Sequence, residues 1–181
     1  MDAHRTRSGR TSESAEPVLR GLLSELVVAV PGAGMGGISC VAPARLFLHT
    51  DERAARIDAG QLRDGTGPCP EAMRTRSAVL ADVTEIRTWW PGFARAAREA
   101  RVFSFLVVPL IGEPQLRAAV SLYGQRSHAF ADTDVPTALN AVAQLRKQLS
   151  DLLRDGNGHA ALVRETTTTP RRKHRPQRRT S

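Results

Sequence analysis

The chain has 181 residues, 41% of them hydrophobic and only 4% aromatic, which suits one ordinary domain whose core is built mainly from aliphatic side chains. The net charge is +8, but residues 164–181 hold seven basic and one acidic residue, whereas residues 21–163 hold 15 basic and 14 acidic ones. The charge therefore belongs to the C-terminal segment rather than to the body, and without a secretory signal or an apolar run near the ~20 residues of a membrane span we expect a cytoplasmic protein with no membrane contact.

The first part of the chain is predicted to form a helix followed by strands. Residues 1–16 are polar and are expected to be a disordered tail. From Val18 to Val30 apolar residues recur every three or four positions, which predicts an amphipathic helix with Pro17 near its start. Two short β-type runs, Ile38–Val41 and Leu46–His49, then predict a hairpin or two consecutive strands.

The middle of the chain has weaker signals. Residues 53–67 are polar and glycine-rich, which indicates a loop or a short helix. One or two helical turns are expected at Glu71–Thr75, since Pro70 is a good first helical residue. A strand is predicted at Ala78–Val83 and a further helix at Pro91–Ala100.

The last third is the most regular part of the sequence. Two strongly apolar runs, Ser104–Ile111 and Leu116–Tyr123, predict strands joined by a short turn. Apolar residues at helical spacing from Asp134 to Leu153 predict a long amphipathic helix, with Asp132 or Thr133 as its N-cap. The order of elements favours an α+β domain whose two terminal helices lie on one face of an antiparallel sheet.

Domain limits follow from composition. We expect one domain over residues 17–156 and a disordered basic tail over residues 157–181.

The glycine-rich segment Gly32–Gly37 matches the G-x-G-x-x-G pattern of dinucleotide sites. That pattern works only where a strand enters the loop and a helix leaves it, because the helix N-terminus holds the pyrophosphate. Here a helix is predicted to enter and a β-branched run to leave. We therefore interpret the segment as a helix-to-strand loop.

The two cysteines, Cys40 and Cys69, are too few for a disulfide scaffold, and the five histidines have no metal-ligand spacing, so no metal site is predicted. Cys69 lies at the start of a predicted helix, whose dipole could favour a reactive thiolate. The alternative is a small apolar side chain that packs the turn, as expected for Cys40 in its strand. Since no known catalytic motif is present, we predict no enzymatic activity.

A ligand cavity is predicted beside the segment from Gly67 to Met73, where free N–H groups at a helix start could meet a ligand. Trp90 and Phe93 would roof the cavity, and the strand with Ser104 and Phe105 would floor it. The candidate ligand-binding residues are Gly67, Cys69, Asp82, Trp90, Phe93, Ser104 and Phe105. The alternative is a fully packed core without a cavity, and no cofactor can be named.

Short motifs spread over residues 18–150 carry a family resemblance. They are Ile57-Asp58, Gln61, Gly65-x-Gly67-Pro68-Cys69, Ala72, Asp82, Trp90-Pro91-x-Phe93, Ala97, Val102-x-Ser104, Pro109-Leu110, Ala119 to Tyr123, Ala129-Phe130 and Asp134. With these motifs the chain resembles a GAF domain, and most closely the actinobacterial GAF domains that are often fused to an RNA-binding ANTAR domain.

The resemblance implies a non-catalytic sensory or regulatory module in bacterial signalling or transcription control, which binds a small molecule or acts as a dimerising adaptor. It implies short helices and loops on the sheet face opposite the terminal helices. It also implies a homodimer formed by the two terminal helices, which Leu139→Glu or Leu145→Glu should disturb. The residues after the last helix are too few for an ANTAR domain, so we expect that part to be missing.

Two other functions stay open. Some GAF-like proteins reduce free methionine sulfoxide, which requires an attacking thiolate and a resolving thiol, and Cys40 and Cys69 are the candidates. The basic tail could instead bind nucleic-acid phosphates weakly and without sequence specificity. The tail residues concerned are Arg171, Arg172, Lys173, Arg175, Arg178 and Arg179.

Overall fold

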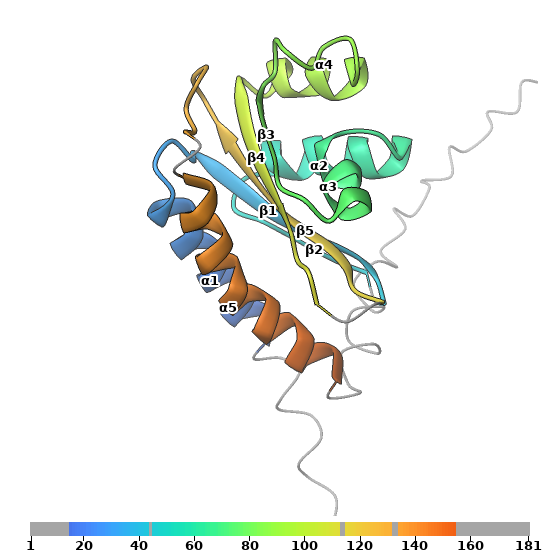
Figure 1. Ribbon diagram of the computed structural model, residues 1–181, viewed down its shortest axis with the longest axis vertical. Helices are drawn as coiled ribbons and strands as arrows, with labels where there is room; N and C mark the ends of the chain where they lie inside the picture. The colour runs from blue at the N-terminus through green and yellow to red at the C-terminus, as the bar shows by residue number, and fades with distance from the viewer. Residues whose placement is uncertain (1–14, 44, 113–114, 132–133, 155–181) are drawn as a thin grey trace, which may run out of the picture.

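The computed structural model describes residues 15–43, 45–112, 115–131 and 134–154 (Figure 1). Within these ranges one antiparallel sheet has the strand order β2-β1-β5-β4-β3. The strands are β1 (Met35–Ala42), β2 (Leu46–His49), β3 (Val79–Asp82), β4 (Ser104–Pro109) and β5 (Arg117–Gly124). The helices are α1 (Ala15–Ala29), α2 (Glu52–Asp64), α3 (Pro68–Thr75), α4 (Pro91–Glu99) and α5 (Asp134–Arg154). The predicted α+β fold is confirmed.

The two long helices, α1 and α5, lie side by side on one face of the sheet (Figure 1), as predicted. Their buried side chains meet the sheet in one large hydrophobic cluster. The helix residues at its centre are Leu19, Leu23 and Leu26 of α1 and Ala138, Val142, Leu145 and Leu149 of α5. Cys40 of β1 belongs to the same cluster.

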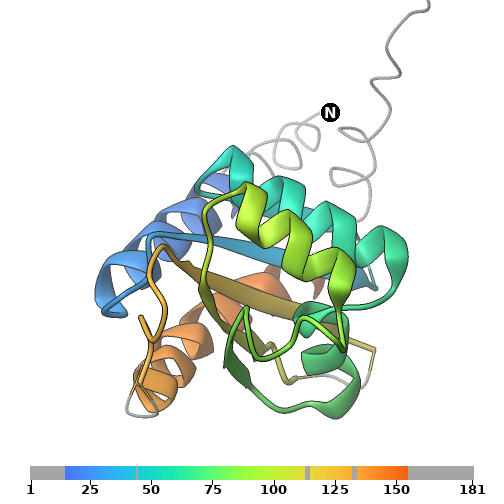
Figure 2. The ribbon, with the colours of Figure 1, turned by 90° about the horizontal axis from the view of Figure 1, so that it is seen from above.

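The other face of the sheet is covered by α2, α3 and α4, as the family resemblance implied. Figure 2 shows α2 and α4 side by side over this face. A second hydrophobic cluster fills the space beneath them and includes Phe105 of β4 and Phe93 of α4. Successive residues of a strand point to opposite faces, so Val107 and Ala119 join this cluster while their neighbours Leu106 and Val120 join the first one.

Helix α2 differs from the prediction of a loop or short helix, since it is a regular helix of 13 residues. Asp51 is its N-cap, with a side-chain oxygen that accepts the Arg53 N–H at 2.8 Å. Gly65 ends it in the left-handed conformation at φ 67°, which glycine adopts without strain. The prediction failed because the buried face of α2 mixes apolar with polar residues and so lacks a clean hydrophobic repeat.

The glycine-rich segment Gly32–Gly37 links a helix to a strand, as interpreted from the sequence. Helix α1 enters it and β1 leaves it, starting at Met35, so no helix N-terminus is available for a pyrophosphate. The expected N-cap at residues 132–133 and most of both expected tails lie outside the described residues. None of the described helices is long and apolar enough to cross a membrane.

Candidate functional site

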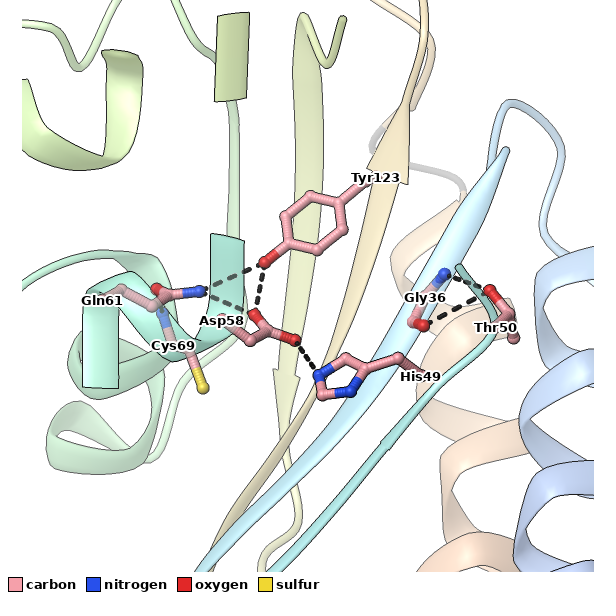
Figure 3. Close-up of polar contacts among 7 residues, drawn as sticks. All are labelled: Gly36, His49, Thr50, Asp58, Gln61, Cys69 and Tyr123. Atoms are coloured by element: carbon pink, nitrogen blue, oxygen red, sulfur yellow. Dashed lines mark hydrogen bonds and ion pairs between the residues drawn. The ribbon is translucent and has the colours of Figure 1, made fainter. Parts of the chain in front are cut away.

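Buried polar side chains gather between the sheet and α2 (Figure 3). We call His49, Asp58, Gln61 and Tyr123 the polar network. Asp58 is its centre, because its Oδ1 accepts the Tyr123 hydroxyl at 2.5 Å and the Gln61 amide at 2.8 Å, while its Oδ2 lies 3.1 Å from His49 Nε2. The Asp58 side chain is 1% exposed and the His49 side chain 14%, so the network reaches from near the surface into the core.

Gln61 links the polar network to α3. Its amide nitrogen also donates to the Tyr123 hydroxyl at 3.1 Å, and its Oε1 accepts the Cys69 N–H at 2.8 Å. Gly67 makes this possible, since a Cβ at that position would lie 2.7 Å from Gln61 Oε1. The first turn of α3 is therefore capped by a side chain of α2. The Cys69 N–H is paired within the chain, whereas the sequence had suggested a free N–H that could meet a ligand.

A second glycine gives the polar network its room. A Cβ on Gly37 of β1 would lie 2.5 Å from Asp58 Oδ2 and 2.5 Å from His49 Cδ2, closer than any side chain could remain. Beside it the Thr50 hydroxyl accepts the Gly36 N–H at 2.9 Å and holds the end of β2 to β1 (Figure 3). The glycines of β1 thus allow His49 and Asp58 to meet.

Two buried hydroxyls on the same face make no close hydrogen bond within the described part of the chain, and the neighbour they share is the Cys69 thiol, a weak hydrogen-bonding group. They belong to Ser39 of β1 and Ser121 of β5, and both side chains lie next to the Cys69 thiol. Buried polar atoms are nearly always paired in proteins, because burying an unpaired one is costly. These hydroxyls are therefore the groups on this face that a bound molecule could satisfy.

The Cys69 thiol and the Tyr123 hydroxyl, which lie around the two serines, lose their protons less readily than usual. Burial raises the pKa of the Cys69 thiol, and the negative charge of Asp58 adds to the effect. Burial, followed by the charge of Asp58, also holds the pKa of the Tyr123 hydroxyl well above its ordinary value. The raised pKa and the complete burial of the side chain favour a protonated thiol near neutral pH, which supports the alternative that Cys69 packs the turn as a small apolar side chain.

The two cysteines do not meet. Cys69 is fully buried in the cluster under α2–α4, whereas Cys40 is buried in the cluster under α1 and α5. The sheet lies between them, so they cannot act as an attacking and resolving pair without unfolding.

Four of the predicted ligand-binding side chains share one region. Cys69, Phe93 and Phe105 are buried in one cluster, against which Trp90 packs from its edge. The rings of Phe93 and Phe105 make an edge-to-face contact with centroids 5.1 Å apart, a favourable aromatic geometry. The structure thus brings these residues together as packed side chains, and their role in ligand binding stays a prediction.

Asp82 and Ser104 lie elsewhere, at the loop between β5 and α5. Asp82 Oδ1 accepts the His128 N–H at 2.9 Å, and its Oδ2 lies 3.1 Å from His128 Nδ1. The Ser104 hydroxyl donates to the Arg126 carbonyl at 2.8 Å. Ser104 precedes Phe105 in β4, so the two side chains point to opposite faces of the sheet, and these two residues do not join Cys69.

Sequence reasoning missed His49, Ser39 and Ser121 as site residues, and it gave Asp58, Gln61 and Tyr123 no role beyond the family motifs. A usable signal was the pair Asp58 and Gln61, three residues apart and therefore on one face of a helix beside Ile57. Within the described residues no group of three or more His, Cys, Asp or Glu side chains could hold a metal ion.

Solved structures show the fold of this chain in other proteins. A GAF domain region from Geobacter sulfurreducens has a TM-score of 0.59 at 15% identity, covering 77% of this chain and 95% of the other. GAF3 of Slr1393 from Synechocystis sp. PCC6803, in its photoproduct state, has a TM-score of 0.57 at 12% identity, covering 78% and 98%. Type II free methionine-R-sulfoxide reductase from Thermoplasma acidophilum has a TM-score of 0.56 at 14% identity, covering 77% and 95%.

Identities this low show the fold alone. Among curated proteins no relative matches the chain. The sequence pattern of the GAF domain matches residues 12–145, which is most of the chain and includes both faces of the sheet. The chain therefore belongs to the GAF domain family.

Proposed function

We propose that this chain is a non-catalytic sensory or regulatory GAF domain that binds a small polar molecule between the sheet and α2–α3. The observation that carries the proposal is the pair of buried hydroxyls of Ser39 and Ser121, which share only the weakly hydrogen-bonding Cys69 thiol as a neighbour and make no close hydrogen bond within the described residues. The two faces of the sheet differ in this respect, since the buried polar residues Ser104 and Asp82 on the face of α1 and α5 are paired with the loop after β5, whereas Ser39 and Ser121 on the face of α2 and α3 make no close hydrogen bond.

A purely structural role accounts poorly for the two serines. Leaving a buried hydroxyl unpaired costs about 1–3 kcal/mol relative to a paired one, and alanine at either position would avoid that cost. Both serine side chains lie beside Cys69, and that of Ser121 also lies beside Tyr123 of the polar network, where a ligand could exchange hydrogen bonds with them. Gly67, Cys69, Trp90, Phe93 and Phe105 would surround such a ligand.

Substitution of the two serines tests the proposal. The double variant Ser39→Ala with Ser121→Ala should be at least as stable as the wild type, while the rise in melting temperature given by a metabolite found in a thermal-shift screen should disappear. Ser24→Ala, an exposed change on α1, should leave both properties unchanged. If the metabolite stabilises the double variant as much as the wild type, the hydroxyls do not bind it.

Finer aspects of the role belong to the same proposal. The motifs around Gly67 and Trp90 support placing the chain with the actinobacterial GAF domains related to ANTAR proteins, acting in the cytoplasm in signalling or transcription control. A homodimer through α1 and α5 would carry the signal to an unidentified protein partner.

The burial of Cys69 and its separation from Cys40 argue against the redox alternative. Reduction of a sulfoxide needs an accessible thiolate and a second thiol to resolve the intermediate. We expect no turnover of free methionine sulfoxide by the purified chain with thioredoxin and its reductase. Turnover that is lost in Cys69→Ser would reverse this assignment.

Nucleic-acid binding by the basic tail is the second alternative. The tail residues Arg171 to Arg179 lie outside the described residues. Six neutralised phosphates would give a log–log salt slope of about −5 on duplex DNA. Deletion of residues 164–181 should abolish this binding and leave the melting temperature unchanged. Equal binding by the truncated chain would show that the tail is not the cause.

A further inference from the structure

A groove of about 450 Å³ runs between α2 and α4 on the outer side of the domain. This volume lies within the usual range of small-molecule sites. Gly92 at the start of α4 faces Asp64 at the end of α2, since a Cβ on the glycine would be 3.7 Å from Asp64 Oδ2. The two helices are therefore antiparallel neighbours, and Figure 2 shows them along the top of the molecule.

Small residues keep the groove open. A Cβ on Gly60, near the middle of α2, would meet no atom within 4 Å, and Ala96 lines the groove from α4. Ile57 and Phe93 line it as well and are 1% and 5% exposed. The groove thus has open space over Gly60, and only small edges of the Ile57 and Phe93 side chains reach its surface.

The charges at the rim are unevenly compensated. The groove is lined by Arg56, Arg63 and Arg95 and by two acidic residues, Asp64 and Glu99. Arg63 pairs with Asp64 at 2.9 Å, and Arg56 lies 3.7 Å from Glu52 on its own helix. Arg95 makes no hydrogen bond or ion pair with any residue that the structure describes. Glu99, one turn further along α4, likewise has no partner among the described residues, so Arg95 is the rim arginine without a carboxylate bonded to it.

We propose that this groove binds a small organic anion with a flat apolar body. The anionic group pairs with Arg95, whose planar guanidinium suits a carboxylate, and the body lies over Gly60 and against Ala96, which line the groove and are partly exposed. The inference is independent of the ligand proposed for Ser39 and Ser121, because the groove is open to the surface and needs no change in the buried layer.

Three probes of one shape test the charge preference on the full chain: 2-naphthoate, 2-naphthalenemethanol and 2-naphthylmethylammonium. In ¹⁵N-resolved titrations naphthoate should shift the Gly60 and Gly92 amide signals with a dissociation constant of about 1 mM or tighter, as expected for a fragment of this size. The alcohol should bind about tenfold more weakly, because it lacks a charge-assisted hydrogen bond. Equal or tighter binding of the ammonium probe, or no saturable shift with naphthoate, overturns the proposal.

Matched variants locate the site. Arg95→Gln should weaken naphthoate binding about tenfold, whereas Arg98→Gln, exposed on α4 but outside the groove, should not. Gly60→Leu should fill the groove and abolish binding, while Gly21→Leu, a helical glycine with equally open surroundings on α1, should preserve it. Unchanged binding in both Arg95→Gln and Gly60→Leu shows that the probe binds elsewhere.

The double serine variant separates this inference from the proposed function. Ser39→Ala with Ser121→Ala should retain naphthoate binding in full. If the serine variant loses naphthoate while Arg95→Gln retains it, the probe enters the buried layer and the groove proposal fails.

Discussion

At the scale of single residues, Gly37 decides whether His49 and Asp58 can meet. Its Cβ position is 2.5 Å from atoms of both side chains, so Gly37→Ala must push them apart or bend β1. We expect a loss of about 1–3 kcal/mol in the free energy of unfolding, as for overpacked cores. Urea denaturation at pH 7 measures this loss.

Gly34→Ala is the matched control for that variant. Its Cβ would lie 3.4 Å from the flexible side chain of Gln125, an ordinary contact, so stability should change little. If both variants unfold at the same urea concentration as the wild type, the polar network does not depend on the missing side chain at Gly37.

Cys69 and Tyr123 should make the protein sensitive to alkali. Both pKa values are raised in the folded state above ordinary values of 9.0 and 10.0, so their stabilising effect is complete below about pH 8.5 and is lost as the pH rises. Once the pH exceeds the pKa that a group has in the unfolded chain, that group lowers the free energy of unfolding by about 1.4 kcal/mol per pH unit. Urea unfolding between pH 7 and 11 should show this decline.

Cys69→Ala isolates the contribution of the thiol. The variant is expected to lose some stability at every pH because it leaves a small cavity, but its decline should begin about one pH unit later than that of the wild type. Wild-type Cys69 should also resist thiol reagents under native conditions. An identical pH profile, or rapid labelling of Cys69, would contradict the burial of an un-ionised thiol.

The residues of the polar network show where sequence reasoning stops. Asp58 and Gln61 stood in the family motifs, and their shared helix face could have been derived from their spacing. Their partners come from β2 and β5, and nothing local indicates that His49 or Tyr123 reaches the same carboxyl group. Which buried polar groups lack a close hydrogen bond, as Ser39 and Ser121 do, is a property of tertiary packing alone.

At the scale of elements, α2 depends on its N-cap. Asp51→Ala should lower the free energy of unfolding by about 1 kcal/mol, since the freed Arg53 N–H loses its acceptor. Asp51→Asn should cost only a few tenths of that amount, because asparagine caps equally well. Thermal unfolding should show the larger loss for Asp51→Ala and the smaller loss for Asp51→Asn. Glu52→Ala, at an exposed residue of the same helical turn, is the control.

The same pair of variants carries a pH dependence. Hydrogen bonds from the Arg53 side chain and backbone lower the pKa of Asp51 to about 2 from an ordinary 3.8. A carboxyl group with a lowered folded pKa stabilises the protein above its unfolded pKa, and this contribution is lost as the pH falls from about 4 to 2. Wild type should lose slightly more stability than Asp51→Asn over this interval, the difference being small because solvent screens the pair. A steeper acid loss in Asp51→Asn would contradict this.

The strands were the most predictable elements. β4 and β5 are buried on both faces, so they appear in the sequence as continuous apolar runs, and α1 and α5 bury one stripe each and show a clear helical repeat. α2 is different because Asp58 and Gln61 occupy positions of its buried face. The polar groups that suggest a site are thus the reason that the helix carrying them was hard to predict.

At the scale of the whole molecule, the outer surface of α1 and α5 is the place to test the expected homodimer. Val18 and Val28 of α1 and Leu139 of α5 are exposed by 45%, 87% and 45%, although the two helices already bury one stripe each against the sheet. Exposed aliphatic side chains on adjacent helices favour association. Leu145, which the sequence offered as a second test position, is 1% exposed in the core, so Leu145→Glu would unfold the domain and cannot report on a dimer.

Leu139→Glu combined with Val28→Glu is the variant that tests the dimer. A second copy packed on this surface would leave two charges buried against apolar side chains, which is costly, so the variant should be monomeric at concentrations where the wild type is dimeric. Phe103→Glu, at a residue 40% exposed just ahead of β4, adds a charge away from both helices and should leave the dimer intact. Light scattering after gel filtration at high micromolar protein gives the masses, with circular dichroism to confirm folding. A monomeric wild type, or a double variant that remains dimeric, places any association of this domain on another surface.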